Sequence, residues 1–242
     1  MGVDLIIVGK HSIPFKSKEI ESKSQIVGLL NSLKFEESEF LIESRKIWNS
    51  AHLHSDWGEE FQRKNEEELA RCLKIRSWQF YSHDRYDYED DDYCPHTRHY
   101  FLEGPYGLEL GINKFFFEID IWVNRYHHWF KANDDYNVLW REKWRQVVYK
   151  VTSILGGDYV MYFPDSSYKL SGYLPCQWFF TDVMQEYLQT PNIGLDKYVE
   201  IISERYAKPI TLAKADKIFA YDLEKTPFIV DRFEDLDKTL KI

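Results

Sequence analysis

The stretch from Tyr136 to Tyr173 constrains the fold more than any other part of the chain. Its first half has apolar residues at steps of three, four and one, which is the spacing of one face of an α-helix. We therefore predict an amphipathic helix with a buried face and a polar face. The buried face comprises Trp140, Trp144, Val147, Val148, Val151, Ile154 and Leu155, and the polar face comprises Arg141, Glu142, Lys143, Arg145, Gln146 and Lys150.

The second half of this stretch predicts a stop, a strand and a loop. Gly156 and Gly157 follow the helix, where glycine accepts the left-handed conformation that ends many helices. The run from Tyr159 to Phe163 has the length and apolar character of a buried strand, and Pro164 ends it because proline lacks an N–H for the ladder. We expect the polar loop that follows to form the rim of any cleft. Its candidate binding residues are Asp165, Tyr168 and Tyr173.

The remaining elements predict an α+β protein, with a mixed, mainly antiparallel sheet packed with several amphipathic helices. Strands and helices alternate without the regular cadence of βαβ units, so one α+β domain over residues 1–242 is expected. The predicted helices are 18–33, 36–47, 64–74, 140–155, 177–188 and 195–206. The predicted strands are 3–8, 75–81, 98–103, 107–111, 114–125, 159–163, 217–221 and 228–233, with a loop at 9–17 and a turn at 111–113.

The charge and apolar content of the chain narrow its class and its partners. The net charge is -9, which argues against nonspecific nucleic-acid binding, because such binding needs Lys and Arg to displace counterions. A basic protein partner fits this charge. We find neither a signal peptide nor an apolar run of the roughly 20 residues that span a bilayer, so we expect a soluble cytoplasmic protein that does not enter membranes. The sequence identifies no cofactor.

The run from Asp84 to Tyr93 is strongly acidic, and its carboxylates are interleaved with three tyrosines. It shows no apolar periodicity, so we predict a long exposed loop. Carboxylates could steer a basic partner and tyrosines could pack against it. Calcium binding is less well supported, because the spacing of an EF-hand is missing; a solvated loop without a partner is the third interpretation. The candidate binding residues are Asp87, Tyr88, Asp90, Asp91 and Tyr93.

The segment from His52 to Asp56 is a candidate metal site. His52, His54 and Asp56 alternate, so in an extended segment they lie on one face and could bind a divalent ion. The segment resembles the opening of the H-x-H-x-D-H motif of the metallo-β-lactamases, which would imply a metal-dependent hydrolase. Trp57 replaces the last histidine of that motif, and the resemblance covers five residues. The alternative is a pair of surface or capping histidines.

A further pair of carboxylates, Glu118 and Asp120, falls on one face of the strand predicted at 114–125. Such a pair could act as acid and base, or could simply be the solvated face of a sheet.

Two functions of different classes follow from the sequence. The first is a non-enzymatic acidic protein-binding module, by analogy of composition an immunity-type protein that neutralises a partner, as bacterial immunity proteins do. The alternative is a metal-dependent hydrolase that uses the His52/His54/Asp56 cluster. Small-ligand binding near residues 162–173 is a third hypothesis.

Overall fold

A computed structural model describes eleven segments of the chain. They are residues 5–14, 19–33, 67, 70–71, 74–80, 100–112, 116–121, 135–164, 195–205, 208–212 and 228–236. Seven strands, three α-helices and one 3-10 turn have bounds within them. In chain order these are β1 (Leu5–Lys10), α1 (Glu19–Asn31), β2 (Gln79–Phe80), β3 (Tyr100–Glu103), η2 (Pro105–Gly107), β4 (Leu108–Ile112), β5 (Phe116–Ile121), α5 (Asp135–Ile154), β6 (Val160–Pro164), α8 (Leu195–Arg205) and β7 (Ile229–Asp231).

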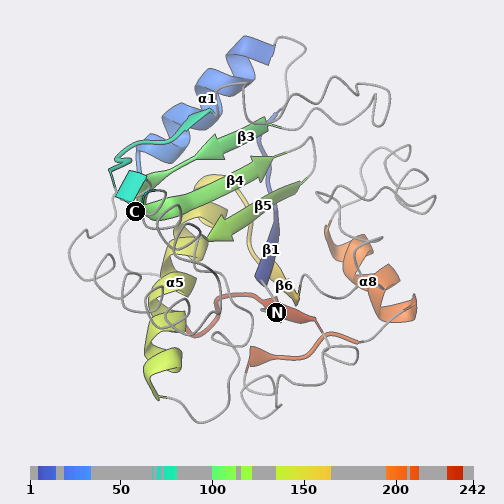
Figure 1. The fold of residues 1–242 in the computed structure, drawn as a ribbon. Helices are drawn as coiled ribbons and strands as arrows, with labels where there is room; N and C mark the ends of the chain where they lie inside the picture. Colours follow the sequence, from blue (N-terminus) through green and yellow to red (C-terminus); the bar gives the residue numbers. More distant parts are fainter. Residues whose placement is uncertain are drawn as a thin grey trace.

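All seven strands belong to one sheet, in the order β2-β3-β4-β5-β1-β6-β7 (Figure 1). Every ladder between neighbouring strands is antiparallel. The first strand of the chain is interior: Ile7 pairs with Ile119 of β5 on one side and with Tyr162 of β6 on the other. The sheet therefore depends on pairing between segments that are far apart in the sequence.

The pleat of the sheet divides its residues between two faces. Because side chains alternate along a strand, the register places Ile7, Ile119, Leu110 and Tyr162 on one face. These four residues belong to the main apolar core. The other face is apolar along the β6 side of the sheet, where Val8 pairs with Met161.

Two helices pack on the first face and complete the main core. The α1 side chains of Ile26 and Leu30 and the α5 side chains of Trp144, Val148 and Val151 are buried in the same cluster as the strand residues. Figure 1 shows α8 on the opposite side of β1 and β6 from α5. The apolar burial that these helices provide is the main driving force for such a fold.

The end of α5 explains the double glycine. Gly156 has φ of +79°, and the N–H groups of Gly156 and Gly157 donate to the carbonyls of Ser153 and Thr152, which is the hydrogen-bond pattern of a Schellman cap. The backbone of β1 runs so close that a Cβ on Gly157 would lie 2.2 Å from the Lys10 carbonyl oxygen. The two glycines therefore end the helix and also let it lie against β1.

The fold class is confirmed at the level of a mixed α+β protein with an antiparallel sheet. The helices at 18–33, 140–155 and 195–206 and the strand at 159–163 are confirmed within a few residues as α1, α5, α8 and β6. Residues 67, 70 and 71 are helical, inside the helix predicted at 64–74. The predictions at 36–47, 177–188, 217–221 and 84–93 lie outside the described residues.

Four predicted boundaries are wrong. The strand expected at 228–233 is the three-residue β7, because the chain leaves the sheet after Asp231 and Phe233 has φ of 54°. Gly9 and Lys10 were expected in a loop but extend β1, because they pair with Phe117 and Phe116 of β5. Ile112 was expected in a turn but pairs with Phe117 as the last residue of β4. The strand expected at 75–81 is the two-residue β2 at its C-terminal end, where Gln79 and Phe80 reach the edge of β3.

Candidate functional site

Most of the residues singled out for function from the sequence lie in segments that the structure does not describe. This holds for the metal candidates His52, His54 and Asp56. It also holds for the binding candidates Asp87, Tyr88, Asp90, Asp91, Tyr93, Asp165, Tyr168 and Tyr173. They remain predictions. Within the described segments, no group of three or more His, Cys, Asp or Glu residues is arranged to hold a metal ion.

The carboxylate pair on β5 does fall within the described part of the chain. Phe116–Ile121 is a strand, as predicted, with Glu118 opposite Gly111 and Asp120 opposite Glu109 of β4. The two residues are thus at alternate positions of one strand, and Glu118 is half-buried. The register therefore places both residues on one face of the sheet, as predicted.

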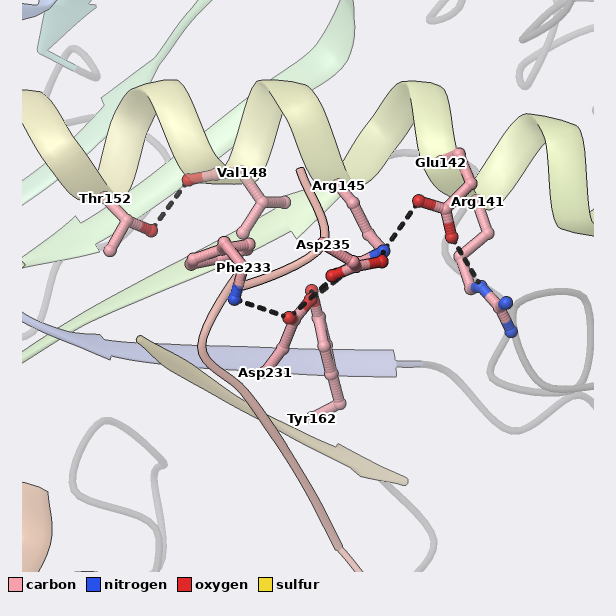
Figure 2. Close-up of polar contacts among 9 residues, drawn as sticks. All are labelled: Arg141, Glu142, Arg145, Val148, Thr152, Tyr162, Asp231, Phe233 and Asp235. Carbon is pink, nitrogen blue, oxygen red and sulfur yellow. Dashed lines mark hydrogen bonds and ion pairs between the residues drawn. The ribbon is translucent and has the colours of Figure 1, made fainter. Parts of the chain in front are cut away.

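The most elaborate polar cluster among the described residues surrounds Arg145 of α5 (Figure 2). Its guanidinium Nε and Nη2 donate to the two oxygens of Asp231 on β7, at 2.7 and 2.9 Å. Its Nη1 and Nη2 donate to the two oxygens of Asp235, at 2.9 and 2.8 Å. Nη1 also donates to Glu142 Oε2, one helical turn earlier, at 2.6 Å.

These contacts use every donor of the arginine. A guanidinium has five N–H groups, and the five hydrogen bonds above occupy one each. The side chains of Arg145 and Asp231 are only 1% and 2% exposed, so both charges are desolvated and must be compensated within the fold. Five carboxylate contacts supply this compensation.

Both oxygens of the buried Asp231 carboxylate also accept two hydrogen bonds each. Its Oδ2 accepts from Arg145 Nε and from the Tyr162 hydroxyl at 2.9 Å. Its Oδ1 accepts from Arg145 Nη2 and from the backbone N–H of Phe233 at 2.9 Å. Asp231 thereby joins α5, β6 and β7 at one point.

The electrostatics of the cluster follow from burial and charge. Burial lowers the pKa of Arg145, but the hydrogen bonds and charges of Asp235, Asp231 and Glu142 outweigh it and raise that pKa. Burial, together with the charge of Asp231, raises the pKa of the Tyr162 hydroxyl well above its ordinary value. The hydrogen bond from Arg145 lowers the pKa of Asp235. In neutral solution the cluster therefore holds a charged arginine, a charged Asp235 and a neutral tyrosine.

This arrangement is suited to structural cohesion. A guanidinium that recognises a substrate anion needs free N–H groups aimed at it, whereas the N–H groups of Arg145 are all directed at carboxylates of the chain itself. We therefore assign the Arg145 cluster to the fold, as the polar junction between α5 and the C-terminal strand.

The sequence prediction for this helix needs a correction. Arg141 and Arg145 were placed on its polar face, yet both side chains are buried. Their positions are adjacent to Trp144 and Val148 on the helix surface, and distant carboxylates compensate Arg145. A signal for this was present in the sequence: Asp231 interrupts the apolar run of the strand predicted at 228–233, and an acid inside a buried strand requires a partner.

A second, smaller cluster ties the opposite edge of the sheet. Glu103 of β3 accepts from Arg71 Nη1 at 2.6 Å and from Gln79 Nε2 at 2.5 Å. Nearby, the Trp78 backbone N–H donates to Asn31 Oδ1 of α1 at 2.7 Å. These bonds fix the short strand β2 and its approach to α1.

Comparison with known proteins finds no matching family model, no similar curated protein and no similar solved structure. Among the described residues, no helix is both long and apolar enough to cross a bilayer.

Proposed function

We propose that the protein is a non-enzymatic acidic binding protein that captures a protein partner, and that it acts in the manner of an immunity-type protein by neutralising that partner. The observation that carries this proposal is the Asp/Tyr run at 84–93, in a chain whose net charge is -9. We infer that the partner is a basic protein. We also infer that the protein acts in the cytoplasm.

The physical reason is that the run combines two properties of an interface. Carboxylates attract a basic surface and accelerate the encounter. Tyrosine supplies contact area and a hydroxyl donor with few rotatable bonds. With 17 Tyr and 8 Trp in the chain, further aromatic side chains are available to extend such an interface, including Tyr168 and Tyr173.

A charge-matched pair of variants tests this proposal. The test variant carries Asp87→Asn, Asp90→Asn and Asp91→Asn. The control carries Asp158→Asn, Glu204→Gln and Glu234→Gln, which are exposed positions and remove the same amount of negative charge. Partner capture from the native lysate, followed by binding kinetics with the purified partner, is the measurement.

We expect the wild type and the control to retain the same partner. The test variant should associate about 10- to 100-fold more slowly, with a smaller dependence on salt. A wild-type protein that retains no partner, or two variants with equally reduced binding, would contradict the proposal.

The alternative function, a metal-dependent hydrolase, rests on the His52-Leu53-His54-Ser55-Asp56 pattern. Protein purified without chelators should then contain about one equivalent of zinc, manganese or iron. The double variant His52→Ala, His54→Ala should lose that metal, whereas His11→Ala should retain it, because His11 accepts a hydrogen bond from the Ile13 N–H next to β1. Absence of bound metal in the wild type excludes this alternative.

A further inference from the structure

The segment Asp231–Asp235, with the following Leu236, forms a hook that closes on α5; we call residues 231–236 the C-terminal hook. The carboxylates of Asp231 and Asp235, four residues apart, accept hydrogen bonds from two edges of the Arg145 guanidinium. Asp231 occupies the Nε/Nη2 edge of Arg145, and Asp235 occupies the Nη1/Nη2 edge. The chain between them must therefore reverse direction within a few residues, as Figure 2 shows.

The reversal takes place at Phe233, where the backbone has φ of 54°. A residue with a side chain rarely adopts this left-handed conformation, which costs on the order of 1 kcal/mol. Three contacts hold it there. The Phe233 N–H donates to Asp231 Oδ1, its ring lies 5.3 Å from the ring of Tyr149 on α5, and its carbonyl accepts from the Leu236 N–H.

The two carboxylates of the hook differ sharply in their access to water. Asp231 is sealed between α5, β6 and β7, whereas the Asp235 side chain is 66% exposed. A proton from solvent can therefore reach Asp235 without any opening of the core. Among the described residues, Arg145 contacts Asp231 and Asp235 of the hook and Glu142 of α5. The Tyr162 hydroxyl of β6 donates to Asp231, and Arg141 of α5 pairs with Glu142 and acts on Asp235 through its charge.

We propose that the C-terminal hook is an acid-released latch, in which loss of the Asp235 charge frees residues 234–236 from α5 while Phe233 stays buried and β7 stays paired with β6. When Asp235 is neutral, Arg145 keeps its two bonds to Asp231 and its bond to Glu142, so the buried charge remains compensated. The loss is confined to the tip, because Phe233 is 1% exposed, belongs to the main core and keeps its bond to Asp231. The hydrogen bond from Arg145 that lowers the pKa of Asp235 places this release in acid, below the ordinary range of aspartate.

The first test compares Asp235→Asn with Glu234→Gln at neutral pH by residue-resolved amide hydrogen exchange. Both variants remove one negative charge from neighbouring exposed positions, but only Asp235 contacts Arg145 through bonds given above. For Asp235→Asn we expect about tenfold faster exchange at Leu236, whereas Phe233, whose N–H donates to the buried Asp231, should exchange as in the wild type. The amides of Met161 and Val230, which are opposite one another in the β6–β7 ladder, should exchange as in the wild type, and Glu234→Gln should change neither set.

Unchanged exchange at Leu236 in Asp235→Asn would overturn the proposal. Equal acceleration of the hook and of the β6–β7 ladder would also overturn it, because the hook would then not open separately.

A second measurement uses the wild-type chain and does not depend on any variant folding. In an NMR titration from pH 7 to pH 3, the Leu236 amide resonance should move with the same midpoint as the Asp235 carboxyl carbon. A Leu236 resonance that stays in place while Asp235 titrates would overturn the latch.

Discussion

Arg145 of α5 and Asp231 of β7 are 86 residues apart in the sequence, and they meet in a buried ion pair with two hydrogen bonds. The desolvation of two such charges can cancel most of their mutual attraction. The pair therefore contributes less to net stability than its geometry suggests. Removal of one partner lowers stability strongly, because the other charge is then left buried without compensation.

Replacement of Arg145 by methionine should be strongly destabilising for this reason. We expect the free energy of unfolding to fall by about 3–5 kcal/mol, as measured by urea denaturation. The matched control is Gln146→Met on the same helix, an exposed position where the change should stay within about 0.5 kcal/mol.

The double variant Arg145→Met, Asp231→Asn then separates compensation from packing. Its loss of stability should be smaller than the sum of the two single losses, because neither charge is left alone. Additive losses would show that the pairing of these two residues is not what the single variants disturb.

Tyr162 should make stability depend on pH in the alkaline range. Burial raises its pKa in the folded state, so the unfolded chain ionises this tyrosine first. The contribution is therefore fully present below about pH 10 and is lost as the pH rises towards the folded-state pKa. Tyr162→Phe should remove up to about 1.4 kcal/mol per pH unit from the alkaline slope, measured by denaturation at several pH values.

At neutral pH, Tyr162→Phe should also cost about 1 kcal/mol, since Asp231 loses a hydrogen-bond donor. Tyr149→Phe, which removes the hydroxyl of a half-buried tyrosine on α5, serves as the control for stability at neutral pH. An alkaline slope in Tyr162→Phe equal to that of the wild type would refute the assignment.

Gly9 should not tolerate a side chain. A Cβ at this position of β1 would lie 2.1 Å from Cζ of the Phe117 ring on β5, so Gly9→Ala must displace a buried ring. We expect a loss of about 1–3 kcal/mol. Addition of Phe117→Leu should make the double variant more stable than the sum of the single effects predicts; strict additivity would argue against this close approach.

Gly28 offers the opposite case. It lies within α1, is exposed, and a Cβ there would meet no atom within 4 Å. Gly28→Ala should therefore raise the melting temperature, with a gain of about 0.5–1 kcal/mol from helix propensity and the reduced freedom of the unfolded chain. A lower melting temperature would indicate a contact of Gly28 that the described residues do not show.

The sequence predicts best the elements whose signals are local. The periodic apolar positions of α5, the glycines that end it and the short apolar run of β6 depend on neighbours within about one or two helical turns. These elements are confirmed within a few residues. Local signals do not reveal which strands pair, so the interior position of β1 was not predicted.

Local sequence signals also fail to predict the burial of single side chains, as the Arg145 cluster shows. On its own helix, Arg145 looks like any residue of a solvated face. Its burial depends on Asp231 and Asp235, which the chain supplies 86 and 90 residues later. The predicted functional residues at 52–56, 84–93 and 165–173 stay predictions, since they lie outside the described segments.

The interior position of β1 also has a consequence for synthesis on the ribosome. β1 emerges well before its partners β5 and β6, which are made more than a hundred residues later, at 116–121 and 160–164. Leu5 to Val8 must therefore wait with both hydrogen-bonding edges and an apolar surface unsatisfied, in a state that is prone to aggregate. We expect nascent chains that stop short of β6 to be strong clients of chaperones, with the dependence ending once β6 has left the exit tunnel.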